Sequence, residues 1–405
     1  MSEVSAAVAY LRSPLAIRAR CETICEAGLA GALNHFTVEL GAMPAVVDRV
    51  AAITRAAYPD LKIPTFGRMT HFRAGGVDRV AQLDLRLAGL SQVERARAWV
   101  DAVTVSVLLD AYAGDAWRFR EGDQVLTRSE GLAVASLRAF EAGVFSSDRN
   151  VPLRADAEGL ATLDAAALAG ALQIDADNPL NGFDGRVALL RALGRAIAAS
   201  PRIFPGGRPG GLLDTLKGEL NGPALLGALL VGLAPIWPGR LDLSLGLGGH
   251  NLGDVWRHPA AGGTGPSAGL VPLHGLSQWL AYSLFEPFER AGRPVAQPGA
   301  LTGIADHRNG GLLVDLGVIV PRRPNVTRDL FAVGDEVIVE WRALTVALLD
   351  RVAEGVQRAL GGSPAELPLS RVLAGGTWAA GRAVAAERRP KGTPPIRIES
   401  DGTVL

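Results

Sequence analysis

The stretch Leu301–Val320 places an acid, an imidazole, a guanidinium and an amide in four consecutive residues, Asp306, His307, Arg308 and Asn309. Gly310 and Gly311 follow, and glycine lets the backbone approach a ligand or another helix closely. These side chains could perform acid–base chemistry or bind a polar ligand through charge-assisted hydrogen bonds. The alternative is a helix start, in which Asp306 accepts backbone N–H bonds and Arg308 forms a solvated ion pair.

Two other polar clusters combine aromatic rings with imidazole and guanidinium groups. The first is Arg68, His71, Phe72 and Arg73; the second is Asn251, Asp254, Trp256, Arg257 and His258. Such groups suit a planar, polar or phosphorylated small ligand, through stacking and bidentate hydrogen bonds. Structural roles are the alternative, because a single histidine is more often structural than catalytic and a tryptophan is more often part of a core.

Several catalytic classes lack their sequence patterns. The six histidines form no HxH or HExxH pattern with a third ligand in sight, so we expect no metal and no other cofactor. Neither a GxSxG nucleophile elbow nor a phosphate-binding loop is present, and Gly246–Gly253 fails as a dinucleotide fingerprint. Acid–base work by carboxylates remains, with four candidates: Asp306, Asp254, Asp315 and Glu340.

The amino-acid composition restricts the kinds of molecule that this protein is expected to bind. The 405 residues contain 41 Lys and Arg against 41 Asp and Glu, without long runs of like charge, which argues against nucleic acid or a membrane surface. Cys21 and Cys25, the only cysteines, cannot form a disulfide framework or a cysteine zinc site. No secretory signal is evident, and the apolar stretch Pro223–Ile236 is too short to span a bilayer. We therefore expect a soluble, cytoplasmic protein.

Helical periodicity dominates the chain and predicts a mainly α fold. A capping box opens Ser91–Tyr112, Phe183–Ser200 has one apolar face, and Leu273–Arg290 is expected to be a helix kinked at Pro287. Gly334–Leu360 is predicted to be a central buried helix that carries Glu340 and Arg342. The chain is expected to form one large helical unit over 1–405, with two packed lobes, about 1–180 and 181–390 and the site between them, as the alternative.

Nine segments together resemble one family. They are HFTVEL (His35–Leu40), YPDLKIP (Tyr58–Pro64), THFRAGGVDR (Thr70–Arg79), FDGRVALLRALG (Phe183–Gly194), FPGGRPGG (Phe204–Gly211), LGDVWRH (Leu252–His258), LSQWLAYSLFEP (Leu276–Pro287), LTGIADHRNGGLLVDLGV (Leu301–Val318) and VEWRALTVALLD (Val339–Asp350). The chain is identified on these motifs as a member of the fungal and bacterial uracil-catabolism (Urc/Urg) family, long a domain of unknown function. The resemblance implies a role in pyrimidine degradation.

A second, more distant resemblance concerns the reaction. Ala305–Arg308 and Glu340–Ala343 are similar, in order and chemistry, to two motifs of the queuosine-salvage nucleosidases, which look like relatives of helix-hairpin-helix DNA glycosylases. His307 replaces a tyrosine of that pattern, and Asn309–Gly310 replaces a valine–proline pair. The resemblance implies an all-α, DNA-glycosylase-like fold and cleavage of an N-ribosidic bond.

Together the two resemblances imply an N-ribosidase that hydrolyses a ribosylurea-type nucleotide, the ring-opened form of uridine monophosphate, to urea and ribose phosphate. Such a reaction needs a carboxylate beneath the ribose and a donor for the departing nitrogen. Asp306 is expected in the first role, Glu340 as a second catalytic residue, and Arg308, His71 or His258 at the phosphate. The expected substrate-binding residues are His71, Phe72, Arg73, Asp254, Trp256, Arg257, His258, Arg308 and Arg342.

Two other function classes stay open at this point. One is an amidohydrolase or ring-opening hydrolase of the same pathway, and the other is a ligand-binding or scaffold protein without activity. The pathway that the resemblance implies also predicts a functional link to a uracil phosphoribosyltransferase and to a cyclohydrolase-like ring-opening enzyme.

Overall fold

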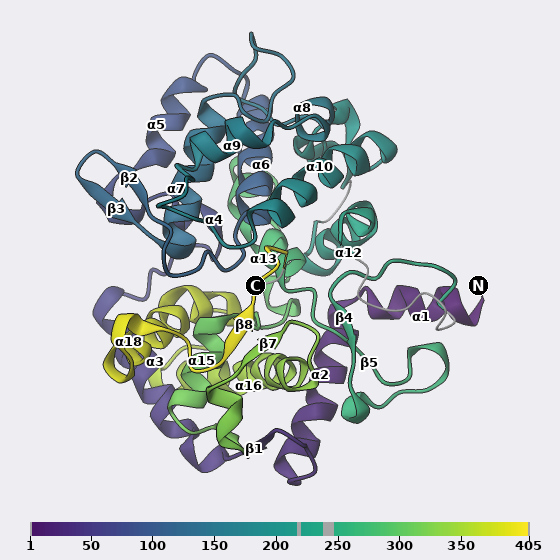
Figure 1. The fold of residues 1–405 in the computed structure, drawn as a ribbon, viewed down its shortest axis with the longest axis vertical. Coiled ribbons are helices and arrows are strands. Elements are labelled where there is room, and N and C mark those ends of the chain that lie inside the picture. The colour runs from purple at the N-terminus through teal and green to yellow at the C-terminus, as the bar shows by residue number, and fades with distance from the viewer. Residues whose placement is uncertain (1, 217–219, 238–246, 404–405) are drawn as a thin grey trace. The chain divides into compact units, whose positions relative to one another are not determined.

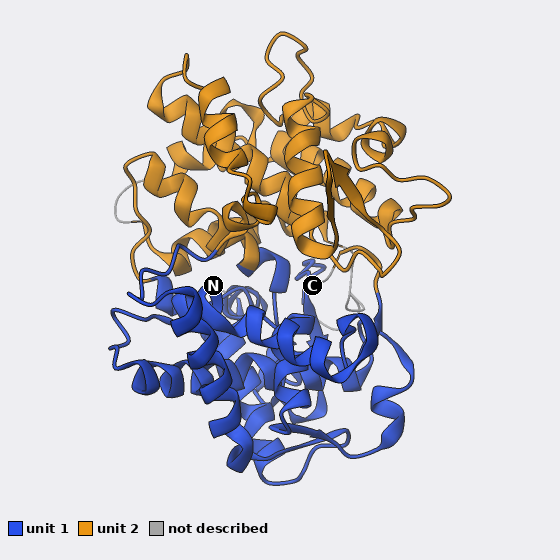
Figure 2. Cartoon of the chain, turned by 90° about the vertical axis from the view of Figure 1, so that its left-hand side faces the viewer, with its two compact units in different colours: residues 1–66, 239–278, 298–399 blue, residues 67–238, 279–297, 400–405 orange. Residues whose placement is uncertain are grey.

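A computed structural model describes residues 2–216, 220–237 and 247–403 of the chain. Contacts divide it into two compact units: residues 1–66, 239–278 and 298–399 form unit 1, and residues 67–238, 279–297 and 400–405 form unit 2 (Figure 2). Each unit is assembled from three separate stretches of chain, so the division does not follow the consecutive lobes 1–180 and 181–390. Helix α13 (Gly275–Ser283) contains one of the boundaries.

The described residues of unit 1 are mainly helical, with three pairs of short strands. Its helices are α1 (Glu3–Leu11), α2 (Pro14–Leu29), α3 (Met43–Ala57), α15 (His307–Asp315), α16 (Glu336–Leu360), α17 (Leu369–Val372) and α18 (Trp378–Arg388). Strand β1 (Phe36–Val38) pairs antiparallel with β6 (Ile319–Pro321), β4 (Val255–Arg257) antiparallel with β5 (Leu270–Pro272), and β7 (Leu330–Ala332) parallel with β8 (Arg397–Glu399).

Unit 2 is also mainly helical. Its helices are α4 (Arg68–His71), α5 (Arg79–Arg86), α6 (Gln92–Leu108), α7 (Arg128–Glu141), α8 (Ala157–Ala161), α9 (Ala165–Ala171), α10 (Phe183–Ala199), α11 (Leu212–Thr215), α12 (Gly222–Gly232) and α14 (Phe285–Arg290). One hairpin, β2 (Phe119–Glu121) and β3 (Gln124–Leu126), completes it among the described residues. The prediction of a mainly α fold is confirmed.

Helix α16 is the centre of unit 1, as the apolar pattern of Gly334–Leu360 predicted. It packs against α2, α3 and α15 (Figure 1). Its residues from Val337 to Leu349 are all buried. Gly361 ends the helix in the left-handed conformation, with φ 73°, which glycine adopts without strain. Glu340 and Arg342, two of the predicted site residues, are therefore carried by a rigid core helix.

Close helix contacts hold α15 between α16 and α18. A Cβ atom at Gly310 would lie 2.7 Å from the Trp341 ring, and one at Gly381 would lie 2.3 Å from the Arg308 carbonyl oxygen. Both separations are below van der Waals contact, so these positions require glycine. The first turn of α15, which contains the Asp306–Asn309 motif, is thereby fixed against both neighbouring helices.

Three predicted helices can be compared with the structure. Helices α6 and α10 match Ser91–Tyr112 and Phe183–Ser200, and the hydroxyl of Ser91 caps the Glu94 N–H at 3.3 Å. Leu273–Arg290 is instead split into α13 and α14, and the break falls at Leu284 rather than at Pro287. Pro287 lies in the first turn of α14, where a missing N–H leaves no helical hydrogen bond unmade.

In the described part of the chain, no helix combines the length and the apolar character needed to cross a membrane.

Candidate functional site

The carboxylate of Asp306 accepts four hydrogen bonds. It is the N-cap of α15, and its Oδ1 accepts the backbone N–H groups of Arg308 at 2.7 Å and Asn309 at 3.1 Å. Its Oδ2 accepts Nδ2 of Asn309 at 2.6 Å and Nε1 of Trp378 at 2.8 Å. The capping alternative is therefore correct for Oδ1, while Oδ2 belongs to a side-chain network that a cap does not need.

Two indole rings contact the residues of this motif. The guanidinium carbon of Arg308 lies 5.1 Å from the centre of the Trp378 ring, which is a cation–π distance. The His307 ring meets Trp341 edge to face, with their centres 6.1 Å apart. Both tryptophans also donate from Nε1, Trp378 to Asp306 and Trp341 to the carbonyl oxygen of Gly310 at 3.2 Å. The rings thus fix the side chains and the backbone of the motif together.

Burial sets the protonation of the motif. It raises the pKa of Asp306 above its ordinary value, although hydrogen bonds from Asn309 and the charge of Arg308 oppose the shift. Burial also lowers the pKa of His307 to about 4, and the positive charges of Arg342 and Arg308 act in the same direction. The His307 imidazole is therefore neutral at neutral pH, and burial favours the protonated form of Asp306.

Asp254 lies in a different environment. Arg342 donates to both of its oxygens, at 2.8 and 2.7 Å, and Nε1 of Trp256 and the N–H of Gly275 donate at 2.6 and 2.8 Å. Burial alone would raise the pKa of Asp254, but the Arg342 charge and these donors hold it well below its usual range. The negative charge of Asp254 is therefore already balanced by Arg342 inside the protein.

Glu340 is completely buried and accepts three donors. Its Oε1 accepts the backbone N–H groups of His35 at 3.1 Å and Phe36 at 2.9 Å, and its Oε2 lies 3.3 Å from Nε2 of His258. Nδ1 of His258 accepts the Ala260 N–H at 3.2 Å, so the proton of the ring lies on Nε2 and points at Glu340. These contacts favour an anchoring role, in which Glu340 joins α16 to β1 and β4.

The predicted site residues fall into both units. Asp306, Glu340, Asp254, Trp256, Arg257, His258, Arg308 and Arg342 belong to unit 1, and His71, Phe72 and Arg73 belong to unit 2. The structure brings Arg308 to Asp306, Arg342 and Trp256 to Asp254, and His258 to Glu340. Arg257 is exposed, between the buried Trp256 and His258 on β4. A single site that includes all of these residues stays a prediction.

The unit 2 cluster around His71 is a buried network. Arg68 pairs with Asp110 at 2.6 Å and donates to the Ser129 hydroxyl at 3.0 Å, and that hydroxyl lies 3.2 Å from Nδ1 of His71. Nε1 of Trp279 also donates to Asp110, at 3.0 Å. Phe72 is fully buried beside Trp99, and Arg73 pairs with Glu286 at 3.3 Å.

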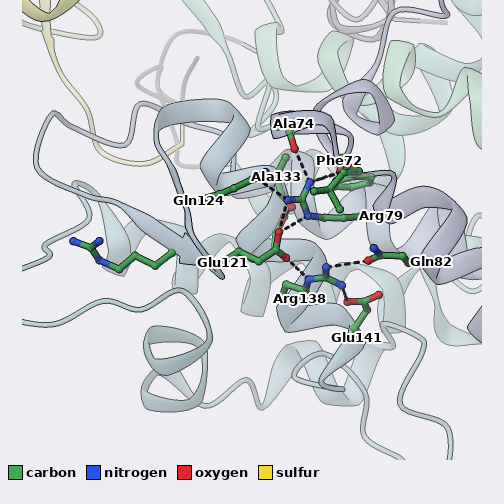
Figure 3. Close-up of polar contacts among 12 residues, drawn as sticks. Phe72, Ala74, Arg79, Gln82, Glu121, Gln124, Ala133, Arg138 and Glu141 are labelled. Carbon is green, nitrogen blue, oxygen red and sulfur yellow. Dashed lines mark hydrogen bonds and ion pairs between the residues drawn. The ribbon is translucent and has the colours of Figure 1, made fainter.

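A second network of unit 2 joins the β2–β3 hairpin to α5 and α7 (Figure 3). Glu121 accepts Nε of Arg79 at 2.8 Å and Nε of Arg138 at 2.7 Å, and Arg138 also pairs with Glu141 at 2.5 Å. Arg79 donates in addition to the carbonyl oxygens of Phe72 and Ala74, at 3.1 and 2.7 Å. Two acids balance two arginines in this network.

Sequence reasoning missed residues that only the fold brings together. Trp378 donates to Asp306 from another helix, and no pattern of neighbouring residues in the sequence predicts that contact. Asn309 was already part of the predicted motif, and a residue three positions after an N-cap faces the cap. His35 and Glu336 were also missed: with Glu340 they place one ligand-type atom each within 4.8 Å of one another, a group that could hold a metal ion.

The chain is similar to known proteins over nearly its whole length. Residues 10–405 match the family described as "Protein of unknown function (DUF1688)". The chain belongs to this family, and the resemblance noted from its motifs is confirmed. Two curated relatives cover nearly its whole length. "Protein urg3" of Schizosaccharomyces pombe is 37% identical over 411 residues, 98% of this chain and 99% of that protein. "Uracil catabolism protein 4" of Lachancea kluyveri is 37% identical over 413 residues, 92% of each.

Proposed function

We propose that this protein acts in uracil catabolism as an N-ribosidase, which hydrolyses a ribosylurea-type nucleotide to urea and ribose phosphate. The pathway follows from the name of the Lachancea kluyveri relative, which aligns with the chain over nearly its full length. The reaction is supported chiefly by one observation: the side chain of Asp306 is fixed by four uncharged N–H donors, one of them from Trp378. The next residue, His307, has a neutral ring that contacts Trp341.

The packing of α15 on α16 adds support. Two segments resemble queuosine-salvage nucleosidases and are far apart in sequence: Ala305–Arg308 leads into α15, and Glu340–Ala343 lies in α16. These two helices are in contact. The Gly310 backbone lies directly against the Trp341 ring between them. A shared ancestral site would produce this juxtaposition, and we extend the proposal to a DNA-glycosylase-like fold on that basis.

The proposed chemistry uses the charge of Asp306. The bond between the ribosyl anomeric carbon and the urea nitrogen breaks with its electron pair going to nitrogen, which leaves an oxocarbenium-like carbon. The Asp306 carboxylate stabilises this positive charge, and water then adds to the carbon. One water proton goes to the departing urea nitrogen, so the products are urea and ribose phosphate. The N–H of neutral His307 can donate to the departing group.

Arg308 is the best-placed candidate for the phosphate. Its guanidinium is oriented by the Trp378 ring, and a planar, oriented guanidinium suits phosphate oxygens. His258, another candidate from the sequence, already uses both ring nitrogens, toward Ala260 and Glu340. His71 belongs to unit 2 and stays a candidate.

A metal-dependent amidohydrolase is the second candidate, favoured by the His35, Glu336 and Glu340 group. Against it, Glu340 already accepts three donors, and Nδ2 of Asn34 donates to Glu336 at 2.7 Å. A cation would have to compete with these hydrogen bonds for the carboxylate lone pairs.

One assay separates the candidates. Purified protein is incubated with ribosylurea 5′-phosphate, uridine monophosphate and uracil, and urea, ribose phosphate and ammonia are measured. Urea and ribose phosphate in equal amounts from the first substrate would support the N-ribosidase. Ammonia release or pyrimidine ring opening would support the amidohydrolase class, and binding without any product would support a ligand-binding protein.

A further inference from the structure

Asn309 carries a buried acceptor that the protein itself does not use. Its side chain is completely buried, and its Nδ2 donates to the Ile304 carbonyl oxygen at 3.0 Å and to Asp306 Oδ2 at 2.6 Å. These two acceptors fix the orientation of the amide. Its Oδ1 meets no hydrogen-bond partner in residues 2–216, 220–237 and 247–403. An orphaned buried acceptor costs about 1–3 kcal/mol, so a donor supplied by a ligand would recover that loss.

A second orphaned group lies next to Trp378 in sequence. The Thr377 hydroxyl is fully buried and has no partner among the described residues. Thr377 ends a single π-helical turn, Leu373–Thr377, between α17 and α18, and such turns often occur at functional sites. Asn309 and Trp378 donate to the same oxygen of Asp306. One unused group, Oδ1, therefore belongs to a donor residue itself, and the other, the Thr377 hydroxyl, belongs to the residue that precedes the second donor.

We propose that Asn309 is a specificity-determining residue, whose Oδ1 accepts a hydrogen bond from a donor group of the ligand bound at Asp306, with the Thr377 hydroxyl as a second contact. The donor is a ribosyl hydroxyl or a ureido N–H; both are neutral donors that suit an amide oxygen. This inference rests on the proposed function for the identity of the ligand, and on the side chains alone for the recognition chemistry.

The chemistry predicts discrimination by the donor. A site with a buried acceptor rejects an analogue that lacks the donor, because binding leaves the acceptor unpaired. Loss of about 1–3 kcal/mol corresponds to roughly five- to more than a hundredfold in affinity. An apolar site of the same shape would bind the two ligands almost equally.

The test is calorimetric and needs no turnover. Ribose 5-phosphate, 2-deoxyribose 5-phosphate and methylurea are titrated into the wild type, Asn309→Ala, Thr377→Val and Trp378→Phe. Trp378→Phe is the matched control, because it also removes one donor from Asp306 Oδ2 but leaves Asn309 Oδ1 in place. Circular dichroism confirms that each variant is folded.

We expect the wild type to prefer ribose 5-phosphate over its deoxy analogue by about tenfold or more. Asn309→Ala should lose this preference, Thr377→Val should weaken it a few-fold, and Trp378→Phe should keep it. Loss of methylurea binding in Asn309→Ala, with the sugar preference unchanged, would assign the donor to the ureido group instead. Should Asn309→Ala fail to fold, the wild-type comparison and Thr377→Val decide.

Two outcomes would overturn the inference. One is an unchanged sugar preference and unchanged methylurea affinity in Asn309→Ala, which would mean that water satisfies the acceptor. The other is the absence of binding by all three ligands. Turnover of ribosylurea 5′-phosphate without any effect of Asn309 would reject the inference but keep the proposed function, and Asn309-dependent binding without turnover would do the reverse.

Discussion

Asp254 and Asp306 are two carboxylates of the same unit in opposite electrostatic settings. Asp254 is held by both arms of Arg342, and its pKa is depressed. The donors that reach Asp306 are uncharged: two backbone N–H groups, an amide and an indole, and its pKa is raised. A charge already neutralised by a guanidinium has little left for a substrate, whereas an ionised Asp306 can stabilise a developing cation.

The largest expected effect concerns the ion pair of Asp254 with Arg342. Arg342→Leu leaves the mostly buried Asp254 without its counter-charge, and we expect a loss of about 3–5 kcal/mol in the free energy of unfolding. Urea denaturation followed by circular dichroism measures it. The double variant Asp254→Asn/Arg342→Leu, in which neither charge remains, should recover much of the loss. If the double variant is as unstable as the single one, the packing of Arg342 matters and its charge does not.

Glu340 is expected to behave like Asp254 rather than like Asp306. Glu340→Gln turns one acceptor oxygen toward its donors as an NH₂ group, which should lower the free energy of unfolding by about 1–3 kcal/mol. Turnover per folded molecule should fall by less than about tenfold. A much larger loss of turnover at unchanged stability would restore Glu340 to the catalytic role predicted from the sequence.

The response to pH sharpens the comparison further. The pKa of His307 is lowered to about 4, so the unfolded chain binds a proton that the folded protein excludes between about pH 6.5 and 4. Stability should therefore decrease as the pH falls through that window, and His307→Gln should flatten the slope. Thermal unfolding at successive pH values tests this, and an equal slope in both proteins would mean that His307 is accessible to protons.

Asp306 is expected to change the stability with pH in the opposite direction to His307. Because its folded pKa is raised, the folded state binds the extra proton, and the contribution of Asp306 to stability is lost as the pH rises through that pKa. Turnover should instead rise with pH over the same range, since the proposed reaction needs the ionised form. An acidic limb of the kcat profile that is no higher than an ordinary aspartate would contradict this.

The smallest expected effect is that of a chelator. The hydrogen bonds already made to Glu336 and Glu340 argue against a resident metal, so prolonged treatment with a chelator should leave turnover unchanged, as should His35→Ala. Stoichiometric metal that is lost together with activity, and restored with it, would instead favour the amidohydrolase.

The sequence predicted elements better than contacts. The 3.6-residue period located α6, α10 and α16 because their apolar faces are long, and the Asp306 cap is a local interaction between neighbouring residues. It could not predict that Trp378 reaches Asp306, since periodicity says which face is buried but not against which helix. The strands β4 to β8 are three residues each, too short to show an alternating pattern.

The predicted site shows the same limit. Residue types marked Asp306 and Arg308 as site residues, and the structure shows that the Arg308 N–H donates to Asp306; their role in a site stays a prediction. Residue types could not show that Asp254 and Glu340 differ from Asp306. The oxygens of Asp254 accept hydrogen bonds from Arg342, and those of Glu340 contact Phe36 and His258, all in distant segments of the chain. A carboxylate in an apolar run needs a donor, but the sequence does not reveal which one it has.

The most direct test of the role assigned to Asp306 is a comparison of Asp306→Asn and Trp378→Phe with ribosylurea 5′-phosphate as substrate. Turnover is expressed per folded molecule, with the folded fraction taken from denaturation curves, because an amide at position 306 also disturbs the donors around Oδ2. We predict that Asp306→Asn lowers turnover by about 10²-fold or more, whereas Trp378→Phe lowers it by less than tenfold. Near-normal turnover per folded Asp306→Asn molecule would show that Asp306 is only a helix cap.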